Sequence, residues 1–306
     1  MSYQHLYKKF LQGHSGYQHF CAHSHHFWPD VTREAILEYW DDAAKHSDKK
    51  WGKIFGEKVP LAQNFIAQTL GLNCAENIVF APNSHELIYR FFSSFYERKN
   101  VRILTTDSEF YSFSRQLKRW IEADLFQVET VSQFPLEDFE KRFCEKASSN
   151  NYDIIFFSQV FFNTGVAVEL DSILPHLPSD SHIIIDGYHS FMALPTDLSA
   201  HQDRVFFTAG SYKYAQAGEG CCFLTLPDGC DLQPVNTGWF AEFKHLGGSR
   251  DQRKTFYPND GMRFAGSTMD MSALYKLIAC FEIFEQEGLS IRDIHAHVQK
   301  QQEIFL

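Results

Sequence analysis

Short apolar segments alternate with amphipathic ones through the middle of this 306-residue chain. The apolar, strand-like runs, rich in β-branched or aromatic residues, lie at 78–80, 102–105, 125–128, 154–159, 182–186, 204–208 and 220–225. Helical patterns separate several of them, for example at residues 60–70, where Pro60 suits the first turn and Gly71 the C-cap, and at 85–96. Strands that are apolar on both faces are typical of a parallel sheet covered by helices. The pattern predicts an α/β fold built from βαβ units.

The two ends of the chain do not share this rhythm. A helix is expected at residues 32–46, with Asp30 or Thr32 as its N-cap. The stretch after about residue 226 is rich in loops, and helical patterns return from about residue 271. The last of them, at 291–306, runs to the final residue, and we therefore expect that a natural continuation is absent.

Composition narrows the class of protein. With 44% hydrophobic residues the chain can bury a large core. Its formal net charge of −10 and the lack of a basic cluster argue against nucleic acid or an anionic membrane as a partner. Its apolar runs are too short to span a bilayer, and the N-terminus lacks a secretory signal, so a cytoplasmic location is expected. The seven cysteines are odd in number and include no C-x-x-C pair, which argues against a disulfide framework or a zinc site.

Two chemical groups follow apolar strands in the second half of the chain. Asp186 and His189 form an Asp-x-x-His at the end of one strand, and Lys213 follows a later one. A buried carboxylate can keep the pyridine nitrogen of pyridoxal phosphate protonated, and a lysine can hold the cofactor's aldehyde as a Schiff base. Separately, an ordinary buried aspartate and a surface lysine would explain them. Their combination predicts a pyridoxal phosphate site.

A turn at residues 82–85 offers a place for the phosphate. Backbone N–H groups and the Ser84 hydroxyl stand there at the start of a helix, where the dipole favours an anion. The plainer alternative is that Ser84 only caps the helix. The chain contains no Walker A motif and no G-x-G-x-x-G fingerprint, so a nucleotide is not the ligand expected at this anion site.

Several motifs together resemble a known family. Asp186-Gly187-Tyr188-His189, Gly210-Ser211-Tyr212-Lys213-Tyr214, Asn236-Thr237-Gly238-Trp239-Phe240 and Arg263-Phe264-Ala265-Gly266-Ser267-Thr268 occur in this order. The chain is similar to the class V aminotransferases among the fold-type-I pyridoxal phosphate enzymes, and within them to the kynureninase branch. The resemblance implies a homodimeric enzyme that acts on an amino acid, with a mostly parallel sheet, helices on both faces and a small second domain. It divides the chain into an N-terminal segment at the site entrance (1–56), a large cofactor domain (57–245), and an interface segment with the start of the small domain (246–306).

The resemblance also assigns roles residue by residue. The residues are Lys213 at the aldehyde and the substrate α-carbon, Asp186 at the pyridine nitrogen, His189 beside the ring or its phenolic oxygen, Thr164 near that oxygen, Phe110 stacked on the ring, Ser84, His85 and Tyr212 at the phosphate, and Trp239, Ser267 and Thr268 reaching the neighbouring subunit's site. Core packing is the plainer alternative for Phe110 and Trp239.

The chain departs from the kynureninase pattern at one position. Phe113 stands three residues after the expected stacking ring, where kynureninases usually have a carboxylate. Arg263 is the internal candidate for binding the substrate carboxylate. Transamination, Cβ–Cγ hydrolysis, desulfuration and epimerisation stay open, with desulfuration less favoured because no cysteine stands in an evident catalytic loop.

Two further alternatives remain. The truncated end and Phe113 would suit a non-catalytic or cofactor-less member that serves as a scaffold or assembly subunit. His23, His25 and His26 invite a metal site, but no carboxylate or cysteine stands at ligand spacing, so we expect no metal. The family places this N-terminal loop near the substrate entrance.

Overall fold

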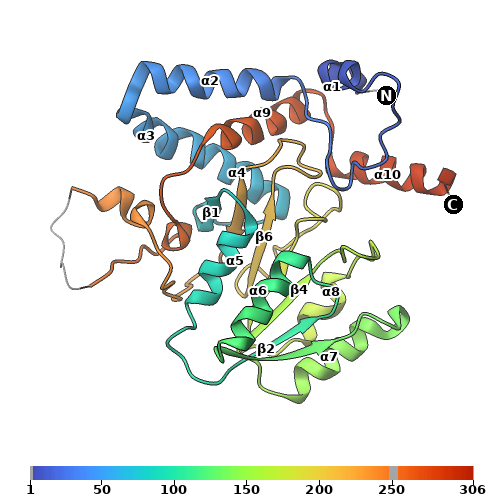
Figure 1. The fold of residues 1–306 in the computed structure, drawn as a ribbon, viewed down its shortest axis with the longest axis vertical. Helices are drawn as coiled ribbons and strands as arrows, with labels where there is room; N and C mark the ends of the chain where they lie inside the picture. Colours follow the sequence, from blue (N-terminus) through green and yellow to red (C-terminus); the bar gives the residue numbers. More distant parts are fainter. Residues whose placement is uncertain (1–2, 248–253, 306) are drawn as a thin grey trace.

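The computed structural model describes residues 3–247 and 254–305, in which one sheet is flanked by helices (Figure 1). Among these residues the sheet has seven strands in the order β1-β7-β6-β5-β4-β2-β3. They are β1 (Ile78–Ala81), β2 (Val101–Thr106), β3 (Phe126–Val131), β4 (Ile154–Ser158), β5 (His182–Asp186), β6 (Val205–Gly210) and β7 (Cys222–Thr225). Each coincides, within three residues at either end, with an apolar run found in the sequence. The predicted α/β fold is confirmed.

The strand directions place the loops that matter for chemistry. β2, β3, β4, β5 and β6 form parallel pairs, whereas β7 is antiparallel to both β6 and β1. The carboxyl ends of parallel strands meet at one edge of a sheet, which is where ligands bind in open α/β folds. The ends of β2, β4, β5 and β6 therefore form one platform.

Helices cover both faces of the sheet. The longer ones are α2 (Val31–His46), α4 (Val59–Leu70), α5 (Ser84–Ser93), α6 (Tyr111–Glu122), α7 (Phe139–Ser149), α9 (Ser272–Gln286) and α10 (Ile291–Phe305). The shorter ones are η1 (Gln4–Tyr7), α1 (Lys8–Gly13), η2 (Ser47–Lys49), α3 (Lys50–Lys53), η3 (Ile54–Lys58), η4 (Ala75–Asn77), η5 (Leu136–Asp138), α8 (Leu170–Ile173), η6 (Leu174–His176), η7 (Trp239–His245) and η8 (Gly261–Phe264). No helix among the described residues is both long and apolar enough to cross a membrane.

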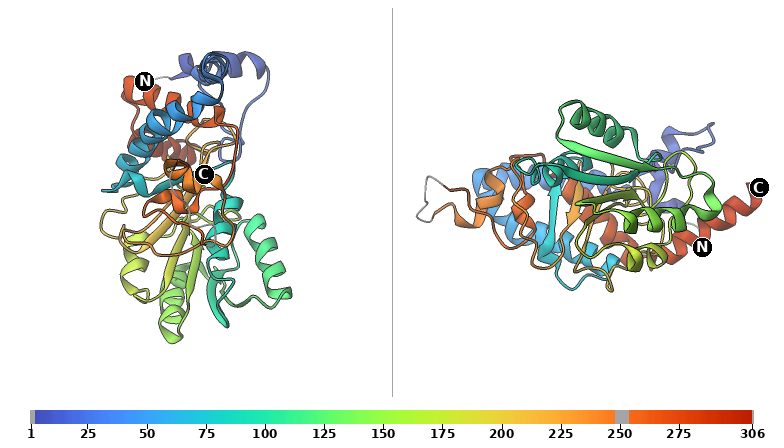
Figure 2. Two further views of the ribbon diagram at one scale, coloured as in Figure 1. Left: turned by 90° about the vertical axis from the view of Figure 1, so that its left-hand side faces the viewer. Right: turned by 90° about the horizontal axis from the view of Figure 1, so that it is seen from below.

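The core lies in two layers, one on each face. Side chains alternate along a strand, so Ile155 and Phe157 of β4 join the layer with α4, α7 and α9, while Ile154 and Phe156 join the layer with α5 and α6. Figure 2 shows α6 and α7 on opposite faces of the sheet. Burial on both faces explains why the strand sequences are apolar throughout rather than alternating.

The N-terminal segment packs against the end of the described chain. α2 lies along α9 (Figure 1), and the hydroxyl of Tyr275 in α9 donates a hydrogen bond of 2.9 Å to Asp42 in α2. The predicted division into three parts is not tested by these contacts, and residues 248–253 of its last part lie outside the described chain.

The helix ends confirm some sequence expectations and correct others. Pro60 stands in the first turn of α4, and Gly71 ends that helix with a φ of 70°, a conformation that glycine adopts without steric cost. Asp30 occupies the N-cap position of α2, but its side chain does not cap the helix. It accepts a hydrogen bond from the Lys9 backbone instead, and the Thr32 hydroxyl donates to the Pro29 carbonyl.

The loop between β6 and β7 carries Lys213. Because β7 is antiparallel to β6, this connection is a short return rather than a crossover helix. Two hydrogen bonds cross this loop. The Ser211 hydroxyl donates to the Gly218 carbonyl, and the Ala217 N–H donates to the Ser211 carbonyl. A side chain at Gly210 would collide with the Tyr188 hydroxyl, so glycine lets the strand approach that ring.

Candidate active site

Asp186 is the last residue of β5 and lies at the centre of the platform. It is 9% exposed, and one carboxylate oxygen accepts a hydrogen bond of 2.9 Å from the Tyr188 N–H. Burial raises the pKa of Asp186, while the Tyr188 N–H and the charge of Lys213 act in the opposite direction. The carboxylate is therefore held in place by the backbone and keeps capacity for a further hydrogen-bond donor.

Lys213 and His189 meet beside Asp186. The Lys213 side chain is buried, and its Nζ contacts the His189 Nε2. Burial lowers the pKa of Lys213 to about 8, against the attraction of Asp186. Burial, together with the charges of Lys213 and His23, lowers the pKa of His189 to about 4. At neutral pH His189 is uncharged, and Lys213 is closer to its reactive neutral form than an exposed lysine.

Aromatic rings surround the lysine. The Lys213 Nζ lies 5.7 Å from the ring centroid of Phe110, 5.0 Å from that of Tyr188 and 5.7 Å from that of Tyr212. The Phe162 ring lies 5.2 Å from Phe110 and 5.9 Å from His189. The structure thus brings the expected Phe110 and Tyr212 to Lys213. It adds Phe162, which could not be singled out from the sequence because it stands in an apolar run.

The first turn of α5 offers N–H groups near the same platform. The N-cap is Asn83, whose side chain accepts a hydrogen bond from the Glu86 N–H, so the alternative that Ser84 caps this helix is wrong. The N–H groups of Ser84 and Ser211 both act to lower the pKa of the Cys222 thiol, which burial raises to about 12. This thiol joins the start of α5 to the loop that carries Lys213.

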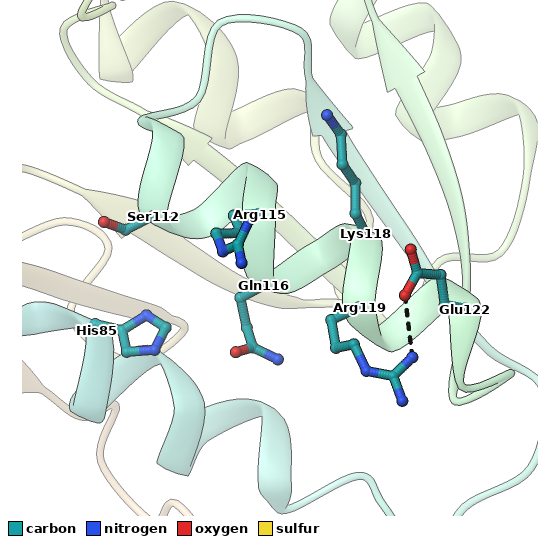
Figure 3. A pocket seen from close by; sticks show the side chains of 7 residues that line it. All are labelled: His85, Ser112, Arg115, Gln116, Lys118, Arg119 and Glu122. Atoms are coloured by element: carbon teal, nitrogen blue, oxygen red, sulfur yellow. Dashed lines mark hydrogen bonds and ion pairs between the residues drawn. The ribbon is translucent and has the colours of Figure 1, made fainter.

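His85 faces a different place. Its exposed side chain lines a groove of about 530 Å³ between α5 and α6, together with Gln116 and Arg119 (Figure 3). The Arg119 guanidinium forms an ion pair of 3.0 Å with Glu122 at the far end of this groove. The expected role of His85 at the cofactor phosphate stays a prediction.

The N-terminal histidines lie over the Lys213 loop. The His25 ring lies 5.8 Å from Tyr212, and the His26 ring lies 6.0 Å from Tyr214. Burial lowers the pKa of His26 to about 4. The described residues contain no group of three or more histidine, cysteine, aspartate or glutamate side chains placed to hold a metal ion. The loop forms one wall beside Lys213, where the resemblance puts the entrance.

Four expected site residues make their contacts elsewhere. Thr164 donates a hydrogen bond of 3.1 Å to Gln133, in the segment after β3. The Trp239 indole donates a hydrogen bond of 3.1 Å to Thr268, and Thr268 and its neighbour Ser267 are exposed. No hydrogen bond or ring contact in the described chain joins these four residues to Lys213.

Arg263 and Phe113 have structural roles. The Arg263 side chain is 6% exposed and donates hydrogen bonds of 3.0 Å to the carbonyls of Pro258 and Leu232. These bonds hold the guanidinium against the backbone, and the expected role of Arg263 at the substrate carboxylate stays a prediction. Phe113 stacks on Phe156 of β4 with 3.7 Å between ring centroids. A carboxylate at this position would be buried in the core.

The residues at the strand ends fit the expected cofactor. Pyridoxal phosphate needs an acceptor for its pyridine N–H, an amine for its aldehyde, ring contacts and donors for its phosphate. Asp186 offers the acceptor, Lys213 the amine and Phe110 the ring contact. The first turn of α5 and the Tyr212 hydroxyl are the candidate phosphate donors.

Solved structures of other proteins share this fold. A lysine-to-alanine variant of C-DES, with glycine covalently linked to its pyridoxal phosphate, has a TM-score of 0.83 and 15% identity, over 99% of this chain and 79% of that one. A cysteine desulfurase from Thermococcus onnurineus NA1 has a TM-score of 0.74 and 17% identity, over 93% of this chain and 72% of that one. The cysteine desulfurase CsdA from Escherichia coli has a TM-score of 0.72 and 14% identity, over 89% of this chain and 68% of that one.

These similarities show that the chain has the fold of the fold-type-I pyridoxal phosphate enzymes. No family model and no curated protein matches the sequence. The kynureninase branch therefore stays a prediction that rests on the sequence motifs.

Proposed function

We propose that this protein is a pyridoxal phosphate enzyme that acts on an amino acid. The observation that carries the proposal is the meeting of Lys213, His189 and Asp186 at the carboxyl ends of neighbouring strands. Such pairs of groups with shifted pKa values are characteristic of catalytic sites. The shared fold supports the proposal, since C-DES and the cysteine desulfurases use the same architecture.

Each residue has a chemical task in this proposal. When bound, the cofactor supplies an electron sink for negative charge at the substrate α-carbon. Asp186 keeps a proton on the ring nitrogen, because a buried anion stabilises the adjacent positive charge. Lys213 would hold the cofactor's aldehyde carbon, and its amine could move a proton at the substrate α-carbon. Neutral His189 would be a hydrogen-bond donor for the cofactor's phenolic oxygen.

The aromatic walls complete the site. Phe110 would contact the cofactor ring, and Phe162 lies next to Phe110 and His189. Phe110 is 36% exposed and Phe162 is 58% exposed, so these apolar rings border the site without closing it to water. Ser84, at the start of α5, and Tyr212 provide hydrogen bonds for the phosphate.

We further propose that the reaction breaks the bond between Cβ and the γ atom of the amino acid. The kynureninase-like motifs imply Cβ–Cγ hydrolysis. The neighbour C-DES is named a cystine C–S lyase, and the others are cysteine desulfurases. All three activities break this one bond, so their agreement favours it over transamination, in which the side chain stays intact.

The working form in this proposal is a two-fold dimer. Trp239, Ser267 and Thr268 gather in one exposed patch and make no contact with Lys213 within the described chain. A two-fold axis would let the patch of each protomer reach the site of the other, so that both sites receive the same groups.

A spectroscopic experiment tests the proposal. The purified protein, supplied with pyridoxal phosphate, should show a visible band that borohydride removes while leaving the cofactor mass on the peptide with Lys213. Lys213→Ala should lack this fixation, whereas Lys118→Ala, a change on the exposed face of α6, should keep it. A wild-type protein that stays colourless would reject the proposal and favour the scaffold alternative. Alanine or pyruvate from cysteine, cystine or kynurenine would identify the broken bond.

A further inference from the structure

A second buried carboxylate stands beside the proposed site. Glu109 follows β2 and directly precedes Phe110, and its side chain is only 7% exposed. Glutamate is rarely buried this deeply unless a cation pairs with it. Among the described residues no lysine, arginine or histidine forms an ion pair with Glu109. Another interaction must therefore offset the free-energy cost of burying the Glu109 carboxyl group.

Three hydrogen bonds hold the Glu109 carboxyl group. The Thr106 hydroxyl, at the end of β2, lies 2.6 Å from Oε1, and the Ser158 N–H donates to the same oxygen at 3.2 Å. The Ser158 hydroxyl, at the end of β4, lies 2.6 Å from Oε2. Glu109 thereby joins two neighbouring strand ends of the platform. Hydroxyl groups both donate and accept, so these contacts accommodate a proton on the carboxyl group.

Asp186 lies on the next strand. Ser158 is the residue that pairs with Asp186 in the β4–β5 register, and the N–H of Gln159 donates a hydrogen bond of 3.0 Å to the Asp186 carbonyl. Burial, and then the charge of Asp186, raise the pKa of Glu109 to about 8, although the bonds from Ser158 and Thr106 oppose this shift. Two buried carboxyl groups this near do not both ionise readily, so one of them retains a proton.

We propose that Glu109 is a positioning residue that keeps a proton at neutral pH, and so leaves the negative charge of the Glu109–Asp186 pair on Asp186. Which group keeps the proton follows from their partners. Asp186 has the nearby charge of Lys213 and a backbone N–H, whereas Glu109 has only uncharged partners. The role given to Asp186 rests on the proposed function, but the proton on Glu109 is a property of the chain itself.

Protonation of Glu109 affects where the negative charge of the pair lies. An ionised Glu109 would compete with Asp186 for protons and would spread the negative charge over two places. A neutral Glu109 keeps the hydrogen bonds to Thr106 and Ser158, and with them the position of the strand end that pairs with Asp186. One fixed negative charge then faces the pyridine nitrogen.

Infrared spectroscopy of the full chain without added cofactor tests the protonation directly. A protonated carboxylic acid has a C=O band that a carboxylate lacks. At pH 6 the wild-type protein should show such a band for a buried acid, and Glu109→Gln should remove it. Raising the pH through about 8 should remove it in the wild-type protein. A spectrum at pH 6 in which Glu109→Gln removes only carboxylate signal would overturn the proposal.

Thermal unfolding across pH gives an independent readout. The unfolded pKa of Glu109 is the ordinary 4.5 and the folded pKa is raised, so the group costs stability as pH rises from 4.5 through about 8. Glu109→Gln has no such cost, because its amide stays neutral and can reproduce the hydrogen bonds. Its melting temperature should gain roughly 5 °C on the wild-type value between pH 5 and pH 9.

The control is Glu282→Gln, an exposed glutamate of α9, whose difference from wild type should be flat over this range. A flat difference for Glu109→Gln as well, or one that favours the wild type at high pH, would show that Glu109 is ionised and the proposal wrong. If Glu109→Gln fails to fold, Asp186→Asn decides: the infrared band should persist in that variant, and its loss would assign the proton to Asp186 and overturn the proposal. Neither readout needs bound cofactor or turnover, so failure here is distinct from failure of the proposed function.

Discussion

Two groups of residues are expected at one active site, but they differ in their burial and in their contacts within the chain. Asp186 and Lys213 are buried at strand ends, where burial raises the pKa of Asp186 and lowers that of Lys213, and the attraction between the two charges opposes both shifts. Trp239, Ser267 and Thr268 lie in an exposed patch, in which the Trp239 indole donates a hydrogen bond to Thr268. The difference teaches that the contacts of the first group are formed within one chain, whereas the role proposed for the second group depends on a second copy of the chain.

The buried group should show the largest effect of mutation. Asp186→Asn keeps the size of the side chain but removes its charge, so the pyridine nitrogen loses its proton and the electron sink weakens. We expect turnover to fall by about 1,000-fold, of the order seen when one preorganised electrostatic group is removed. Steady-state kinetics measure the loss, and the exposed Asp180→Asn is the control. Near-normal turnover in Asp186→Asn would remove the main distinction between the two groups.

The pKa of Lys213 gives a smaller, pH-dependent effect. Only the neutral amine attacks an aldehyde, and burial brings its pKa down to about 8. The rate of cofactor attachment should therefore rise roughly 10-fold from pH 7 to pH 9 and then level off. Stopped-flow absorbance follows this rate. An exposed lysine with an ordinary pKa would give a rise of roughly 100-fold that continues above pH 10, and that result would mean that burial does not prepare Lys213.

The exposed patch should give the smallest effect. Trp239→Ala should lower turnover by about 10-fold, as expected for loss of an interface aromatic, while the visible band at Lys213 stays unchanged. Sedimentation should show dimers for the wild-type protein. Trp40→Ala, on the exposed side of α2, is the matched control. A monomer that is fully active would show that the patch plays no part in the site.

The sequence predicts the parts of the structure that depend on local pattern. Strands buried on both faces have continuous apolar runs, so all seven could be located, and Asp186 stands out because a charge follows such a run. The direction of β7 could not be read in this way. An apolar run has no direction, and the return after β6 depends on hydrogen bonds across the Lys213 loop.

Glu109 and Phe162 show what the sequence cannot reveal. Glu109 stands between a polar turn and an aromatic residue, a pattern that also suits a surface loop. Its burial depends on Ser158, 49 residues away, which is placed by the pairing of β2 with β4. Phe162 belongs to an apolar run that resembles core sequence, yet it is 58% exposed beside Phe110. Both roles arise from contacts between distant segments.

The antiparallel return after β6 has a consequence for how this protein can vary in length. The segment from Ser211 to Cys221 is tied to β6 at one end and β7 at the other, with bonds across its middle. One inserted residue would displace Lys213 from Asp186, because both are positioned from neighbouring strands of the same sheet. The segments that lead from helices back to strands at the opposite edge carry neither Asp186 nor Lys213. Insertions and deletions are therefore tolerable there and not in the Lys213 loop.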